Sequence, residues 1–114
     1  MNELIGIGRF RFHDGSLEEF KRLSAQVMEI VRTTDTGTLQ YDIYFNDDQS
    51  ESIVVERYKD SSALMEHAYH VGHLMEAIFA TGLVSSEMLG DPSAEIRATI
   101  AGGEVRLFTP FLPL

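Results

Sequence analysis

The residue types best suited to acid–base chemistry lie between positions 54 and 73. Glu56 falls near the end of an apolar segment, and His67 follows it on a segment with helical periodicity. At about 100° per residue, His67 projects from the edge of the apolar stripe of that helix, so we expect it to face inward toward the carboxylate. An imidazole with a pKa of about 6.5, oriented by a carboxylate, is a suitable general base. The residues alone leave two interpretations open: His67 and Glu56 are candidates for a catalytic pair, or His67 makes only a structural hydrogen bond in the core, for example to Glu56.

Two further histidines follow His67 at steps of three residues. His70 and His73 lie on the same predicted helix. Each step advances the helix by about 300°, so the first and third imidazoles point about 120° apart, whereas metal-binding pairs on helices are completed by ligands from other elements. We therefore predict no metal site and expect His70 and His73 to be solvated surface residues.

Three tyrosines in predicted strands are candidates for binding a substrate through their hydroxyl groups: Tyr41, Tyr44 and Tyr58. The alternative is that they serve packing, as aromatic side chains on a sheet more often do. The segment Gly6-Ile7-Gly8 lacks the third glycine and the following helix of a dinucleotide motif. We expect a strand bend or a close backbone approach there, and no cofactor.

Hydrophobic periodicity and turn residues divide the chain into strands and helices. Alternation predicts strands over residues 4–12, 38–45, 52–58, 83–89 and 104–108, and helical spacing predicts helices over 16–33, 61–79 and a short stretch after Pro92. Ser16 to Glu19 fits a capping box at the start of the first helix, and Gly72 is a point where the second helix could split. The order β-α-β-β-α-β, with an extra short helix and strand, predicts an α+β, ferredoxin-like split βαβ fold with an antiparallel sheet.

One face of such a sheet would remain uncovered, because the two long helices pack on the other face. The uncovered face still carries leucine, isoleucine or tyrosine, and the C-terminal tail adds Phe111, Leu112 and Leu114. A large exposed apolar patch is unusual in a monomer. We therefore predict a homodimer that packs sheet against sheet.

Length and composition fit one small acidic domain. The 114 residues are 44% apolar, and 9 Lys and Arg against 18 Asp and Glu give a formal charge of −9, which disfavours nucleic acid and membranes as partners. The chain has no cysteine and no tryptophan, so disulfides, thiolate catalysis and thiolate-bound metals are excluded. The first residues lack the basic and apolar regions of a signal peptide, and we expect a cytoplasmic protein.

Two sequence elements together resemble a known family. They are Thr36-Gly37-Thr38-Leu39-Gln40-Tyr41 and Glu56-Arg57-Tyr58-Lys59-Asp60, the second leading to Ala63-Leu64 and His67. In this combination they resemble the antibiotic biosynthesis monooxygenase (ABM) family of the dimeric α+β barrel superfamily. The resemblance implies one ABM-like domain over residues 1–114, with a core over about 4–90 and a C-terminal helix, strand and tail over 91–114.

The same resemblance implies an activity. Characterised members of the family oxidise quinols or anthrones with molecular oxygen and use no flavin, metal or haem. By this resemblance His67 would be the base, Glu56 its orienting partner, and Tyr41 or Tyr44 hydrogen-bond donors to the substrate. The expected partners are a small aromatic molecule and a second copy of the chain. The alternative is a non-catalytic dimeric protein that binds a small apolar ligand or acts as an accessory protein.

Overall fold

Residues 2–112, which the computed structural model describes, form five strands and three helices. In chain order the elements are β1 (Leu4–Phe12), α1 (Leu17–Thr33), β2 (Thr38–Phe45), β3 (Glu51–Tyr58), α2 (Ser61–Phe79), β4 (Gly82–Leu89), α3 (Ala94–Ile100) and β5 (Val105–Phe108). These bounds agree with the predicted ranges to within about two residues, and α2 continues through Gly72 without a break. None of the described helices combines the length and the apolar character needed to cross a membrane. Leu114, part of the apolar tail, lies outside the described residues.

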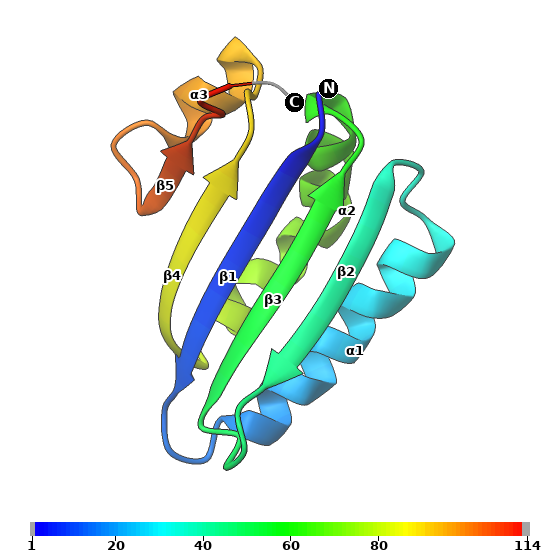
Figure 1. The fold of residues 1–114 in the computed structure, drawn as a ribbon. Helices are drawn as coiled ribbons and strands as arrows, with labels where there is room; N and C mark the ends of the chain where they lie inside the picture. Colours follow the sequence, from blue (N-terminus) through cyan, green and yellow to red (C-terminus); the bar gives the residue numbers. More distant parts are fainter. Residues whose placement is uncertain (1, 113–114) are drawn as a thin grey trace.

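The strands form one sheet, and α1 and α2 lie on one of its faces (Figure 1). The strand order is β2-β3-β1-β4-β5, and the first four strands pair antiparallel. β5 instead pairs parallel with β4, because the chain crosses back through α3 before it re-enters the sheet. The predicted α+β ferredoxin-like fold is confirmed, and β5 makes the sheet mixed rather than purely antiparallel.

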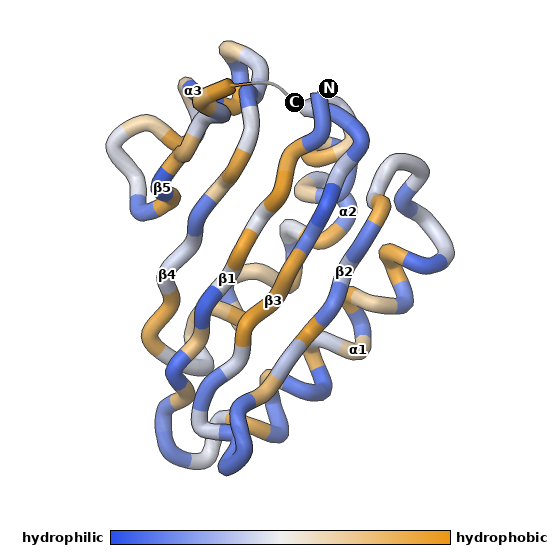
Figure 2. Tube along the Cα trace, in the orientation of Figure 1, coloured by the Kyte–Doolittle hydropathy of each residue, from blue (hydrophilic) through white to orange (hydrophobic). Residues whose placement is uncertain are grey.

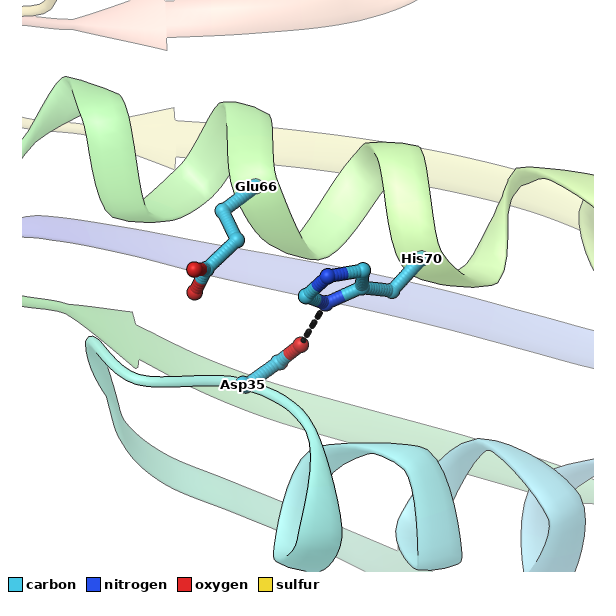
Figure 3. Close-up of side chains that lie close together, drawn as sticks. All are labelled: Asp35, Glu66 and His70. Carbon is cyan, nitrogen blue, oxygen red and sulfur yellow. Dashed lines mark hydrogen bonds and ion pairs between the residues drawn. The ribbon is translucent and has the colours of Figure 1, made fainter.

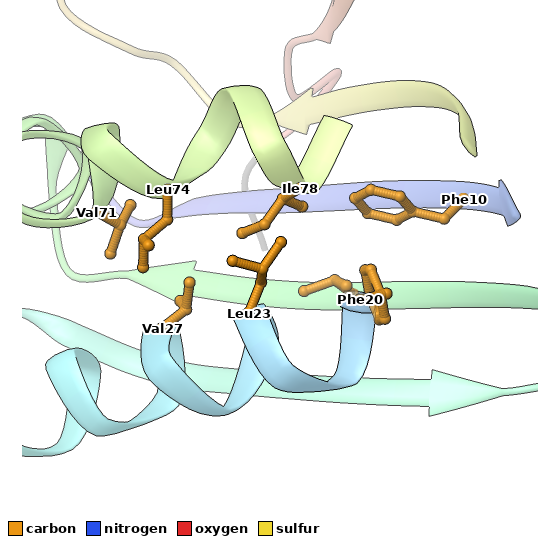
Figure 4. Close-up of a cluster of buried hydrophobic side chains, with 8 residues drawn as sticks. Phe10, Phe20, Leu23, Val27, Val71, Leu74 and Ile78 are labelled. Carbon is orange, nitrogen blue, oxygen red and sulfur yellow. The ribbon is translucent and has the colours of Figure 1, made fainter. Parts of the chain in front are cut away.

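The main core lies between the sheet and the two long helices. Apolar residues recur at steps of three and four along α1, so one face of that helix is buried. Side chains from α1, α2 and β1 meet there (Figure 4): Phe20, Leu23, Val27, Val71, Leu74, Ile78 and Phe10. Figure 2 shows that the central strands β1 and β3 also carry hydrophobic stretches. This packing fixes which residues of α2 face the sheet.

The two long helices begin in different ways. Ser16, before α1, has a helical backbone, and its side chain makes no capping hydrogen bond. The predicted capping box is therefore wrong, and Glu19 pairs with Arg22 instead, at 2.7 Å. Asp60, before α2, has an extended backbone, and its carboxylate accepts a hydrogen bond of 2.8 Å from the Ala63 N–H.

Replacing Asp60 with alanine should lower the free energy of unfolding by about 1 kcal/mol, because the Ala63 N–H loses its acceptor. Urea denaturation followed by circular dichroism measures this change. Ser16→Ala is the matched control, since the Ser16 hydroxyl caps nothing, and it should change the unfolding free energy by less than about 0.5 kcal/mol. Equal losses in the two variants would contradict the capping role of Asp60.

Two glycines of β1 face the helices. Side chains alternate along a strand, so Gly6 and Gly8 point to the same side of the sheet as the buried Leu4. A Cβ added to Gly6 would lie 3.8 Å from the Cβ of Glu56, and one added to Gly8 would lie 3.6 Å from Cε1 of Phe10. Both are ordinary contact distances to side-chain atoms, so of the two expectations for this segment, a strand bend or a close backbone approach, the close backbone approach is wrong. The glycines instead leave space between the sheet and the helices.

Candidate functional site

His67 is buried on α2, as its place at the edge of the apolar stripe predicts. Only 5% of its surface is exposed, and its ring packs against the rings of Tyr41 and Tyr58, with centroid separations of 5.6 and 5.3 Å. Its Nδ1 atom lies 2.7 Å from Oδ2 of Asp35, a residue in the segment between α1 and β2. Asp35 was not predicted from the sequence, yet it is the direct hydrogen-bond partner of His67.

The Asp35 carboxylate holds two histidines at once. Its side chain is 1% exposed, and its Oδ1 lies 2.7 Å from Nδ1 of His70 (Figure 3). Burial by itself raises the pKa of this carboxyl, but hydrogen bonds from His70, His67 and Thr38 outweigh burial and leave the pKa below its usual value. An ionised carboxylate only accepts hydrogen bonds, so both imidazoles present an Nδ1–H to it. The prediction that His70 is a solvated surface residue is therefore wrong, whereas His73 is exposed as predicted.

Glu56 lies near the second nitrogen of the His67 ring. The distance from Nε2 of His67 to Oε1 of Glu56 is 3.9 Å, which is longer than a hydrogen bond. The Tyr58 hydroxyl donates a hydrogen bond to the same carboxylate. Burial raises the pKa of Glu56, against the smaller opposing effects of the Tyr58 hydrogen bond and of the charge on His67. Once ionised, Glu56 is therefore a stronger base than a solvated glutamate.

The three candidate tyrosines differ in their relation to Glu56. Tyr41 pairs in register with Glu56 across β2 and β3, and Tyr58 is its hydrogen-bond donor. Burial raises the pKa of both Tyr41 and Tyr58, so both hydroxyls stay neutral and can donate hydrogen bonds. Tyr44 is 55% exposed and, three residues after Tyr41 on one strand, points to the opposite face of the sheet. The structure does not bring Tyr44 to this site.

A cavity of about 170 Å³ lies between the sheet and the helices beside these groups. Tyr41, Glu56 and Tyr58 contribute to its polar lining. Its apolar lining includes Phe10, Val54, Leu64, Met75, Ile78 and Met88. His67 is not among the lining residues. Of the predicted catalytic pair, Glu56 is therefore the one that a bound molecule would meet.

Asp35, Glu66 and His70 are the described residues best placed to hold a metal ion. One potential ligand atom from each lies within 4.8 Å of the others, and Figure 3 shows Glu66 and His70 on α2 facing the Asp35 segment. The Glu66 carboxylate accepts hydrogen bonds of 2.8 and 3.0 Å from the backbone N–H and the hydroxyl of Thr36. Asp35 and His70 are hydrogen-bonded to each other. Hydrogen bonding between α2 and this segment therefore accounts for the cluster.

A match to a protein family adds independent evidence. The model of the family described as antibiotic biosynthesis monooxygenase matches residues 4–74, which is more than half of the chain. The chain belongs to the ABM family. The resemblance identified in the sequence is thus confirmed, and the match includes Asp35, Glu56 and His67. The cavity of this chain is also lined by residues that lie beyond the matched range, from Met75 to Val105.

Solved structures share the fold of this ABM protein over most of its length. MupZ from Pseudomonas fluorescens is 20% identical, with a TM-score of 0.81, and the match covers 99% of this chain and 88% of MupZ. Rv0793 from Mycobacterium tuberculosis is 22% identical, with a TM-score of 0.69 and coverage of 80% and 96%. SnoaB, a cofactor-independent oxygenase from Streptomyces nogalater, is 14% identical, with a TM-score of 0.67 and coverage of 77% and 91%. No curated protein matches the chain. At these identities the likeness establishes the fold.

Proposed function

We propose that this ABM protein is a cofactor-independent monooxygenase that oxidises a quinol- or anthrone-like aromatic substrate with O2. The observation that supports the proposal is the series of acid–base groups from Asp35 through His67 to Glu56, of which Glu56 lines the apolar cavity. Oxygenation of an electron-rich aromatic requires a base to form the substrate anion and an apolar pocket to exclude water. The shared fold with SnoaB, a cofactor-independent oxygenase, is consistent with this chemistry.

In this proposal Glu56 removes the proton from the substrate. His67 then accepts the proton at Nε2, after a movement of about 1 Å that brings the two side chains to hydrogen-bond distance. Asp35 keeps the Nδ1–H of His67 in place and stabilises the imidazolium with its negative charge. This proposal changes the roles expected from the sequence: Glu56 is the first base, His67 is the second, and Asp35 is the orienting partner. Tyr41 and Tyr58 supply neutral hydroxyls that can donate hydrogen bonds to the oxygen anion of the substrate.

The proposed chemistry requires no added reductant. Deprotonation of a phenol gives a phenolate, which transfers electrons to O2 as a new carbon–oxygen bond forms. When the O–O bond breaks, one oxygen atom remains in the product as a quinone carbonyl and the other leaves as water. All the electrons come from the substrate, and the protons removed from it are returned to the leaving oxygen. The site therefore only has to move protons and exclude water.

Oxygen uptake by the purified protein tests the proposed function. With hydroquinones, naphthols or anthrones as substrates, no added flavin or nicotinamide, and a metal chelator present, we expect O2 consumption equal to product formation. Isotope-labelled O2 should place one labelled oxygen atom in each product molecule. Inactivity with every substrate, together with tight retention of a small apolar molecule, would support a non-catalytic binding protein instead. Uptake that begins only after a flavin or a metal is added would contradict cofactor independence.

We also propose that the protein acts as a homodimer joined through the sheet face opposite the helices. Tyr44 and Ile53 are paired neighbours on that face and are 55% and 38% exposed. Leu83, on β4, is 64% exposed. A second copy of the chain would bury these side chains, which supports the sheet-to-sheet dimer expected from the sequence.

A further inference from the structure

We infer that the cavity takes a compact, uncharged phenol with one ring or two fused rings, and that Gly6 and Gly8 set this size limit. The inference rests on the proposed function, because it concerns the substrate of the same site. Of the two substrate classes proposed above, it favours the quinol-like molecules, which are smaller than the three-ring anthrones.

The space for the ligand comes from the two glycines of β1. In the register of the sheet, Gly6 lies between Glu56 of β3 and Met88 of β4. Gly8 lies beside Val54 of β3, and all five residues line the cavity. Glycine is unfavourable inside a strand, because it adds freedom to the unfolded chain and contributes no side chain to the core. Its presence twice on the buried face of a central strand is explained by the space that it leaves.

The volume of this space limits the size of the ligand. At about 170 Å³, the cavity is slightly larger than an engineered protein cavity of roughly 150 Å³ that binds benzene. It therefore accommodates one substituted ring or two fused rings, and a flat system of three rings would project beyond it toward Phe79. Phe79 is among the lining residues and is 50% exposed. The cavity thus reaches the surface near the end of α2, where a ligand can enter.

The lining favours an uncharged ligand with one hydrogen-bonding end. Among the described lining residues, the ionisable side chains are acidic or phenolic, and none is a lysine or an arginine. A carboxylate or phosphate group in the cavity would therefore be buried without a cation to pair with. A phenolic hydroxyl can donate a hydrogen bond to Glu56 while its ring lies over the glycines, between Val54 and Met88. This placement brings the acidic proton of the ligand to the proposed base.

Titration with small phenols in the absence of oxygen tests the size limit without turnover. The probes are phenol, 1-naphthol, the three-ring 9-phenanthrol and the anionic 4-hydroxybenzoate, and backbone amide shifts of β1 report binding in the cavity. We expect phenol and 1-naphthol to bind there, and the other two to bind at least about tenfold more weakly than 1-naphthol. The inference is overturned if 9-phenanthrol binds as tightly as 1-naphthol, or if phenol and 1-naphthol do not bind.

Substitutions at Gly8 test the origin of the size limit. Gly8→Val fills the floor of the cavity and should weaken 1-naphthol binding at least about tenfold. In Gly8→Ala the added Cβ would meet Phe10 and Val54 at 3.6 and 4.0 Å, and this variant should weaken 1-naphthol binding less. Gly8→Ala provides the test if Gly8→Val does not fold. Gly72→Ala is the matched control, since a Cβ there has nothing within 4 Å, and it should bind like the wild type. Unchanged 1-naphthol affinity in the folded Gly8 variants would overturn the role given to Gly8.

The inference and the proposed function fail in different ways. Size-selective binding of phenols without oxygen uptake would contradict the oxygenase and leave the ligand class standing. Oxygen uptake with three-ring anthrones as fast as with naphthols would support the oxygenase and overturn the size limit.

Discussion

Replacing Glu56 with glutamine should lower kcat for the oxygen-dependent reaction by about 100-fold or more. Glutamine keeps the shape of the side chain and an oxygen that can accept the hydrogen bond from Tyr58, but it cannot take up a proton at neutral pH. The fold should therefore be retained while the base is lost. Steady-state oxygen uptake measures kcat, and circular dichroism checks that the variant is folded.

The pH dependence distinguishes a base from a residue that only fills space. Burial raises the pKa of Glu56, so the wild-type kcat should rise with pH as this carboxyl ionises, over a range above the usual one for glutamate. Glu56→Gln should lose this rise. Glu51→Gln, at the exposed start of the same strand, is the matched control and should keep the wild-type kcat and pH profile. Wild-type activity in Glu56→Gln would show that another group accepts the proton.

The inward position of His67 could be predicted because it depends on a single helix. Helical spacing places it at the edge of the stripe that Val71 and Leu74 also occupy, and all three are buried. The position of Glu56 follows in the same way from strand alternation, since it shares a face of β3 with the buried Val54 and Tyr58. Periodic elements therefore indicate which residues face the core, and here they indicate both members of the predicted pair.

The hydrogen-bond partner of His67 could not be predicted by the same reasoning. Asp35 precedes His67 by 32 residues and lies in a segment without periodicity, so no local pattern separates it from an exposed acidic residue such as Asp47. Packing of α1 against α2 is what brings its carboxylate to two imidazoles. The sequence nevertheless contains a usable signal: a buried histidine has two ring nitrogens to satisfy, and the acidic residue at the end of the neighbouring helix is a candidate for one of them.

The roles of Ser16 and of the β1 glycines depend in the same way on contacts with other elements. Ser16 has the residue type of a helix cap, but its helical backbone does not direct the hydroxyl at a free N–H. Gly6 and Gly8 are visible in the sequence, whereas the space above them exists only because side chains from α1, α2 and β4 surround it without filling it. A local sequence pattern does not contain that information.

Replacing Asp35 with asparagine should lower the free energy of unfolding at pH 7 by about 2 to 4 kcal/mol. His67 and His70 contact different oxygens of Asp35, and asparagine replaces one of these oxygens with an NH2 donor, so one of the two Nδ1–H groups loses its acceptor. The substitution also removes the negative charge of Asp35, which both imidazoles contact. Urea denaturation measures the loss, and Asp47→Asn, at an exposed turn, is the control that should stay within about 0.5 kcal/mol of the wild type.

Acid pH separates the loss of the Asp35 charge from a loss of packing. The pKa of Asp35 is lower in the folded protein than its ordinary value, so its ionisation stabilises the folded state at every pH above the unfolded pKa of about 3.9. That stabilisation is lost as the pH falls through the folded pKa. The difference in unfolding free energy between wild type and Asp35→Asn should therefore be complete at neutral pH and should narrow below about pH 4. A difference that stays constant into the acid range would contradict this account, because asparagine would then replace the protonated carboxyl as poorly as it replaces the carboxylate.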